Sequence, residues 1–128
     1  MESLIAPMLD DLLYPSESDE PVAYFSREWP NEQPPQLTEV AALLDRPERE
    51  TVTERDPARF WELVTIDQSW YGPEEQQRTR RFVELRQVLE TNLTHVKYFE
   101  VGEVEVTLLL LGLNGTQLCG VTAMAVRT

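Results

Sequence analysis

The chain has 128 residues, 23 of them acidic and 11 basic, so its formal net charge at pH 7 is −12. A surface of this sign repels nucleic-acid phosphates and anionic lipids, which argues against a direct nucleic-acid or membrane partner. The 41% hydrophobic content and three tryptophans exclude a disordered acidic tail, and the length fits a single domain over residues 1–128. Net charge otherwise speaks to solubility and association rather than to fold.

Cysteine usage and the N-terminus indicate a cellular compartment. Cys119 is the only cysteine, so no internal disulfide can form, and its apolar neighbours predict a buried, inert thiol. A single thiol suits a reducing cytoplasm, which is the expected location. The first basic residue is Arg27, so no secretory signal is expected. No apolar run approaches the length that would span a bilayer.

The N-terminal 26 residues carry six carboxylates and no basic side chain, which predicts a strongly electronegative end. Apolar residues at three-to-four-residue spacing between Leu4 and Leu13 predict an amphipathic helix, with Ser3 as its N-cap. The segment Tyr14–Pro21 (YPSESDEP) breaks this pattern and predicts an acidic loop. Val22–Ser26 then predicts a strand.

Short elements are expected in the middle of the chain. Trp29–Pro35 is a Pro-rich connection, and Thr38–Leu44 predicts a small helix. Glu50–Glu54 (ETVTE) predicts a strand. Asp56–Pro57 then suits the cap and first turn of a further helix around Phe60.

A loop with two adjacent aromatic residues precedes the longest predicted helix. Asp67–Pro73 (DQSWYGP) ends in a Gly-Pro pair that favours a loop. Glu74–Leu93 has apolar residues at helical spacing and two glutamates in its first turn, where the helix dipole favours negative charge. The expected core stripe of this helix is Phe82, Leu85, Val88, Leu89 and Leu93.

The last third of the chain changes to a strand pattern. Val96–Val101 and Glu103–Leu111 predict two strands joined around Gly102, the second with alternating polar and apolar residues at its start. Asn114–Gly115 marks a turn, and Leu118–Arg127 predicts the final strand. The residues therefore predict α/β content, with an antiparallel C-terminal sheet and helices packed against it.

The sequence contains no arrangement that predicts catalysis. His95 is the only histidine, and no nucleophile motif or phosphate-binding loop accompanies it. We therefore expect His95 to be a structural or surface residue. One Cys and one His also cannot supply the usual ligand set of zinc. The protein is predicted not to be an enzyme and to need no cofactor.

The remaining charged clusters predict no chemistry of their own. Glu103 and Glu105 share a face of the predicted strand, but nothing around them would separate two pKa values as a catalytic pair requires. The acidic loop lacks the Gly-centred spacing of a calcium loop. The arginines of residues 78–81 lie among many acids on one helix, so a nucleic-acid patch is not expected.

Four segments of the chain resemble the nuclease A inhibitor family, whose members are small proteins that bind and block a secreted, sugar-non-specific, magnesium-dependent nuclease. The resemblance covers almost the whole chain and is weakest over residues 27–60. It is carried by LLYPSES (Leu12–Ser18), QSWYGPEE (Gln68–Glu75), the segment Asn92–Val106 that ends in GEVEV, and LCGVTAMAVRT (Leu118–Thr128).

This resemblance implies a three-layer α/β/α sandwich, with a mainly antiparallel C-terminal sheet, and four partner-binding residues. Glu17 would approach the catalytic magnesium of the nuclease in place of a substrate phosphate. Thr128 would enter the same cleft, and Trp70, together with Gln68, would lie at the interface as an aromatic anchor. Ser69 stands where the family has an acidic residue, which removes one expected salt bridge.

The prediction is therefore a cytoplasmic inhibitor that occludes the active site of a sugar-non-specific nuclease, one to one, with no metal of its own. The alternative is an acidic nucleic-acid mimic or interaction module that binds a basic protein surface. The two differ in what controls affinity. Binding by a mimic should follow total charge, whereas an active-site plug should depend on a few residues and on the partner's metal.

Overall fold

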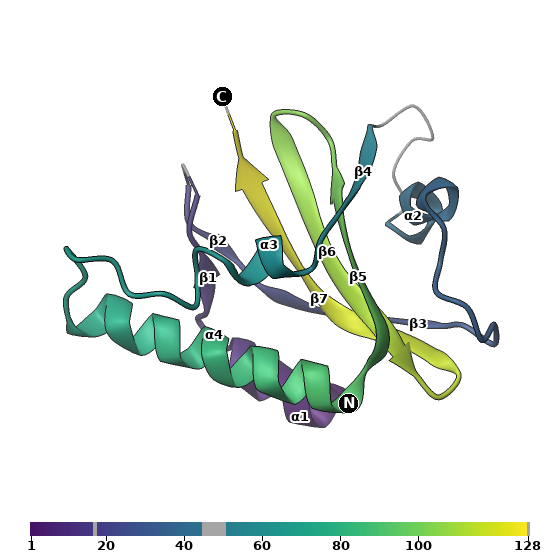
Figure 1. The fold of residues 1–128 in the computed structure, drawn as a ribbon, viewed down its shortest axis with the longest axis horizontal. Coiled ribbons are helices and arrows are strands. Elements are labelled where there is room, and N and C mark those ends of the chain that lie inside the picture. Colours follow the sequence, from purple (N-terminus) through teal and green to yellow (C-terminus); the bar gives the residue numbers. More distant parts are fainter. Residues whose placement is uncertain (17, 45–50, 128) are drawn as a thin grey trace.

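Five antiparallel strands form one sheet at the centre of the protein (Figure 1), in a computed structural model that describes residues 1–16, 18–44 and 51–127. The strand order is β3-β7-β6-β5-β4, which makes β6 the central strand. Both edge strands come from the first half of the chain, where the sequence predicted strands at Val22–Ser26 and Glu50–Glu54, and they extend the predicted C-terminal sheet on either side. The strands are β3 (Ala23–Glu28), β4 (Val52–Arg55), β5 (Thr94–Val101), β6 (Glu105–Asn114) and β7 (Gln117–Val126).

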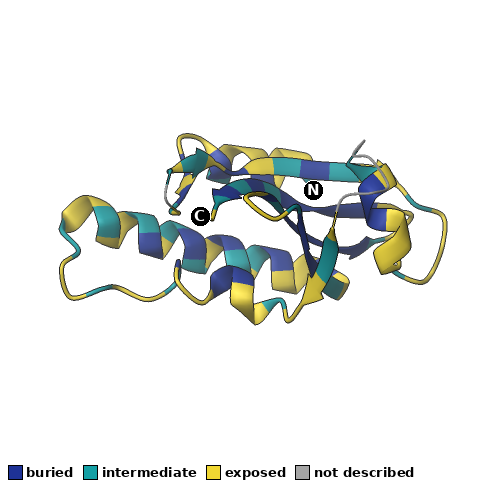
Figure 2. Ribbon diagram, turned by 90° about the horizontal axis from the view of Figure 1, so that it is seen from above, coloured by how far each residue is buried: buried dark blue, intermediate teal, exposed yellow. Residues whose placement is uncertain are grey.

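The sheet is buried on both faces because its central strands are apolar on both sides. On β6, Leu108 and Leu110 belong to one core cluster, whereas Leu109 and Leu111 belong to a second. Successive side chains of a strand point to opposite faces, so a nearly continuous run of leucines is what a strand covered on both faces requires. In Figure 2 the central strands are buried along most of their length.

Different helices contribute to the two core clusters. Helix α4 contributes to the first cluster. Its buried residues form a helical stripe through Phe82, Leu85 and Leu89, as the sequence predicted. The helix contributing to the second cluster is α2, through Val40. The helices are α1 (Glu2–Ile5), the short 3₁₀ helix η1 (Ala6–Leu9), α2 (Leu37–Leu43), α3 (Ala58–Trp61) and α4 (Pro73–Asn92).

The prediction of one N-terminal helix through Leu13 is wrong. The α-helical turn ends at Ile5, the 3₁₀ helix that contains Pro7 follows, and the chain reverses at Asp11, where φ is +57°. Proline has no N–H to continue an α-helical ladder, which accounts for the change of helix type. Ser3 is also not the cap, because the N-cap position is Met1.

The acidic segment after this reversal is a hairpin rather than an irregular loop. Its strands β1 (Leu13–Tyr14) and β2 (Glu20–Pro21) pair in antiparallel fashion. Tyr14 is buried, and its hydroxyl donates a 2.6 Å hydrogen bond to the carbonyl of Phe60 in α3. The hairpin is thus attached to the core through an apolar residue that the sequence had assigned to a loop. We refer to residues 13–21, apart from Glu17, as the acidic hairpin.

Several local predictions are confirmed by the backbone. The Asp56 carboxylate accepts a hydrogen bond from the backbone N–H of Ala58 at the start of α3, and Gly115 has φ of +60° in the turn between β6 and β7. Cys119 is fully buried. The strand predicted from Glu103 begins two residues later, at Glu105. No helix within the described ranges is long and apolar enough to cross a membrane.

Gly120 provides a test of how closely β6 and β7 pack. A Cβ atom at this position would lie 1.9 Å from the carbonyl oxygen of Leu110. Because that atom is backbone, no side-chain rotation relieves the overlap, and Gly120→Ala should lower the free energy of unfolding by about 3 kcal/mol or more. Urea unfolding would measure this change.

Gly115→Ala is the control for the same substitution without the overlap. A Cβ there meets nothing within 4 Å, and only the positive φ opposes it, so the cost should be about 1–2 kcal/mol. A Gly120→Ala variant that is as stable as Gly115→Ala would contradict the close approach of the two strands.

Candidate functional site

The acidic hairpin meets the end of β7 at one edge of the sheet. The Ser16 hydroxyl oxygen accepts a hydrogen bond from the backbone N–H of Val126 at 3.3 Å, across 110 positions of sequence. Hairpin, α3, β5 and β7 together enclose a pocket of about 430 Å³, to whose lining Ser16 and Arg127 both contribute. Two residues predicted to bind a partner, Glu17 and Thr128, lie outside the described residues, but the residues that precede them in the chain share this pocket.

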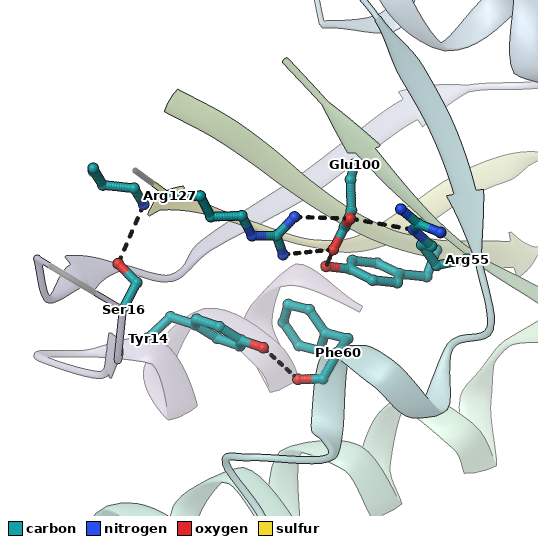
Figure 3. A network of polar contacts seen from close by, with 8 residues as sticks. Tyr14, Ser16, Arg55, Phe60, Glu100 and Arg127 are labelled. Atoms are coloured by element: carbon teal, nitrogen blue, oxygen red, sulfur yellow. Dashed lines mark hydrogen bonds and ion pairs between the residues drawn. The ribbon is translucent and has the colours of Figure 1, made fainter. Parts of the chain in front are cut away.

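A buried carboxylate forms the floor of the same region (Figure 3). Glu100 is only 5% exposed and accepts two hydrogen bonds from the guanidinium of Arg127, at 2.9 and 2.7 Å. The Tyr98 hydroxyl donates to it at 2.8 Å, and the Arg55 Nε donates at 3.5 Å. Tyr98 and Glu100 are alternate residues of β5, and Arg55 of β4 lies opposite Tyr98. Side chains at such positions point to the same face of a sheet, which is why these three side chains converge.

Electrostatics in this network favour the charged form of the carboxylate. The hydrogen bonds from Arg127, helped by that from Tyr98 and opposed by burial, lower the pKa of Glu100 to about 2. The pKa of Arg127 is raised in turn, mainly by its bonds to Glu100. Burial raises the pKa of the Tyr14 phenol to about 12. Near neutral pH the network therefore holds one fixed negative and two fixed positive charges.

Arg127 is also held through its backbone. Its N–H donates to the carbonyl of Val104 at 2.8 Å, which continues the β6–β7 pairing one residue beyond the end of β7. The Arg127 side chain is 49% exposed, and its guanidinium binds Glu100. Main chain and side chain together give the described end of β7 a defined position, where an unattached terminal segment would fray.

The second predicted region, the loop before α4, exposes its tryptophan. Trp70 is 71% exposed, and its ring lies edge-on to that of Tyr71 with 4.6 Å between centroids. The carbonyl of Gln68 accepts a hydrogen bond from the Tyr71 N–H at 3.0 Å, and the Arg78 guanidinium lies 5.6 Å from the centroid of the Tyr71 ring. Trp70 is therefore not a core residue, and its role in binding, like that of Gln68, stays a prediction.

The start of α4 connects this loop to the acidic hairpin. A second pocket, of about 390 Å³, is lined by Asp11 and Asp19 on the hairpin side and by Glu74, Glu75 and Arg78 on the helix side. The Glu75 carboxylate accepts a hydrogen bond from the Gly72 N–H at 3.0 Å, which fixes where α4 begins. Hairpin and loop thus flank one common, mainly acidic surface.

Sequence reasoning missed both the buried network and an exposed apolar rim. The only signal for Glu100 was a charged residue inside the otherwise apolar strand segment Tyr98–Val101, which is a weak one. The rim residues are large apolar side chains outside the core, and nothing in their local pattern marks them as exposed. They are Leu63, which lines the pocket beside Ser16, and Val104, whose carbonyl accepts the Arg127 N–H, at 65% and 55% exposure respectively.

Within residues 1–16, 18–44 and 51–127, no group of three or more His, Cys, Asp and Glu side chains is placed to hold a metal ion. His95 is exposed at the start of β5, with φ of +54°. The prediction that it is a structural or surface residue agrees with this position.

The chain matches a known protein family over its full length. The family model described as "NuiA: Nuclease A inhibitor-like protein" matches residues 1–128, the whole chain. No curated protein matches the chain.

Glu100→Gln tests the network through pH. Folding lowers the pKa of Glu100 from 4.5 to about 2, so its contribution to stability is complete above pH 4.5 and is lost as the pH falls towards 2. At pH 7 the variant should be less stable by about 1–3 kcal/mol, since it loses charged hydrogen bonds. The difference should shrink between pH 4.5 and 2, by up to about 1.4 kcal/mol per pH unit. Urea unfolding at a series of pH values measures both quantities.

Glu90→Gln is the matched control, because Glu90 forms an exposed ion pair with Arg86 at 3.2 Å on α4. Such a pair contributes about 0.5 kcal/mol or less. A stability difference between wild type and Glu100→Gln that stayed constant over the whole pH range would contradict the depressed pKa.

Proposed function

The chain belongs to the nuclease A inhibitor-like family, a family of non-enzymatic inhibitors, and we propose that it binds and occludes the active site of a sugar-non-specific, metal-dependent endonuclease, one to one. The observation that carries this proposal is the hydrogen bond between Ser16 and Val126. It joins the acidic hairpin to the end of β7, and in the sequence the proposed contact residues Glu17 and Thr128 directly follow Ser16 and Arg127.

Glu17 is proposed to present its carboxylate to the divalent metal of the nuclease. A nuclease cleft holds a phosphate against a divalent cation and basic side chains, so a carboxylate without a scissile bond can occupy the same position. The setting of Glu17 in the chain supports this role, since Asp19 and Glu20 follow it closely and no basic residue occurs before Arg27. Any metal in the complex then belongs to the partner, and the inhibitor needs no cofactor.

Thr128 and the loop before α4 complete the proposed contact surface. The attachment of Arg127 to Val104 and Glu100 supports a defined approach for Thr128. The exposure of Trp70 supports its role as an anchor, because large aromatic side chains buried on binding dominate interface energies. Gln68 lies in the same turn. Ser69, in place of the family's acidic residue, removes one salt bridge and is proposed to alter partner preference.

Other features of the family belong to the same proposal. A three-layer α/β/α sandwich is supported by the two apolar clusters that involve α4 and α2 separately. A cytoplasmic location is supported by the single, unpaired Cys119. The inhibitor would then protect the cell that makes it from the nuclease.

The net charge of −12 favours a second candidate function. An acidic mimic of nucleic acid would bind a basic protein surface through its summed charge, with little dependence on any one residue. The plug and the mimic therefore make opposite predictions for variants that remove equal charge from different places.

Glu17→Gln should weaken inhibition by about 2–5 kcal/mol if Glu17 is a buried charge contact in the complex. Glu84→Gln removes the same charge from an exposed position on α4 and should leave inhibition unchanged. The measurement is the inhibition constant for digestion of both DNA and RNA by a purified sugar-non-specific, magnesium-dependent nuclease. Equal losses in the two variants would favour the mimic instead.

Trp70→Ala should weaken inhibition by about 30-fold or more, since an aromatic anchor contributes about 2 kcal/mol or more. Its stability should change little, because the side chain is 71% exposed. Leu37→Ala truncates another exposed apolar residue, on α2, and should leave the inhibition constant unchanged. Full inhibition by Trp70→Ala at an unaltered melting temperature would remove Trp70 from the interface.

A further inference from the structure

The Ser16 hydroxyl has all of its hydrogen-bonding capacity in use. It donates to the carbonyl of Ser18 at 2.6 Å and accepts from the N–H groups of Ser18 and Val126, both at 3.3 Å. A serine hydroxyl offers one donor and two acceptor lone pairs, so this set is complete. The Ser18 hydroxyl, two residues later, donates instead to the carboxylate of Glu20 within the hairpin.

The Val126 N–H is available to Ser16 because of where β3 ends. Pairing between β3 and β7 stops at Ala23↔Thr122, although β7 continues to Val126. Beyond Thr122 the outer edge of β7 therefore has no β3 partner, and an uncovered strand edge carries unpaired backbone groups. The acidic hairpin lies along this part of β7 (Figure 1), and Ser16 provides the acceptor for the last N–H of the strand.

The other sides of this strand end are held by the sheet and its floor. Val126 lies opposite Glu105 of β6, and the next N–H, that of Arg127, donates to Val104. Below, the Arg127 guanidinium binds Glu100. Figure 3 shows Ser16 and Glu100 on either side of Arg127. Of the residues that hold this strand end, Ser16 is the one that belongs to the acidic hairpin. Its hydrogen bond to Val126 therefore connects the hairpin to β7.

We propose that Ser16 is a positioning residue, whose hydroxyl couples the acidic hairpin to the end of β7 so that both segments meet the nuclease as one preformed surface. This inference rests on the proposed inhibitory function. A contact surface ordered before binding loses less conformational entropy in the complex than two segments that move independently. Loss of the hydroxyl should therefore weaken inhibition although Ser16 itself need not touch the partner.

Three variants separate this role from a general effect on the hairpin. Ser16→Ala removes the hydroxyl, and Ser16→Thr retains it at an exposed position. Ser18→Ala removes the neighbouring hydroxyl, which donates to Glu20 within the hairpin. In the free protein, amide hydrogen exchange of Val126 should accelerate about tenfold in Ser16→Ala and stay within twofold of wild type in the other two. One lost hydrogen bond of about 1.4 kcal/mol corresponds to this factor.

The inhibition constant should follow the same order. Ser16→Ala should raise it about tenfold while the melting temperature falls by no more than several degrees, whereas Ser16→Thr and Ser18→Ala should inhibit like wild type. Unchanged Val126 exchange in Ser16→Ala would overturn the coupling, and accelerated exchange with full inhibition would overturn its role in binding. A wild-type protein that inhibits no sugar-non-specific nuclease would overturn the proposed function, and the exchange data would then show whether the coupling exists without it.

Discussion

The register between β6 and β7 is the constraint on which the rest of the structure depends. Ten residue pairs run from Asn114↔Gln117, next to the turn, to Glu105↔Val126 at the far end. Because side chains alternate between the two faces, a slip of one residue would reverse the leucines of β6 and turn Arg127 away from Glu100. One tight turn thus determines both the packing of the core and the position of the strand end some ten residues away.

The buried Glu100 shows how that position is maintained. Taking a carboxylate out of water costs several kcal/mol. The ion pair with Arg127 offsets this cost only because Tyr98 and Arg55 supply further hydrogen-bond donors to Glu100. Such pairs contribute little net stability compared with apolar packing. The main effect of this ion pair is on geometry rather than on stability. The Arg127 guanidinium bonds both oxygens of Glu100, which fixes its orientation as well as its position.

The surface around this strand end combines features that proteins use for recognition. Glu62 and Glu100 line the pocket at this strand end, and exposed Leu63 and Val104 lie close by. Charge of one sign accelerates encounter with a basic cleft, whereas apolar contacts and fixed polar groups decide which partner stays bound. In the proposed complex, the net charge of −12 and the few positioned residues would therefore act at different stages of association.

The sequence by itself determined the elements that depend on neighbours along the chain. Helical spacing identified α4, alternation identified the three C-terminal strands, and Asn114–Gly115 identified their turn, because periodicity and turn chemistry are local. Resemblance to a family, and not any local pattern, pointed to Glu17 and Thr128. Tertiary structure alone decided that Glu100 is buried. It alone brought Ser16 to Val126, since contacts across 110 positions depend on how strands pair and pack, which no short segment encodes.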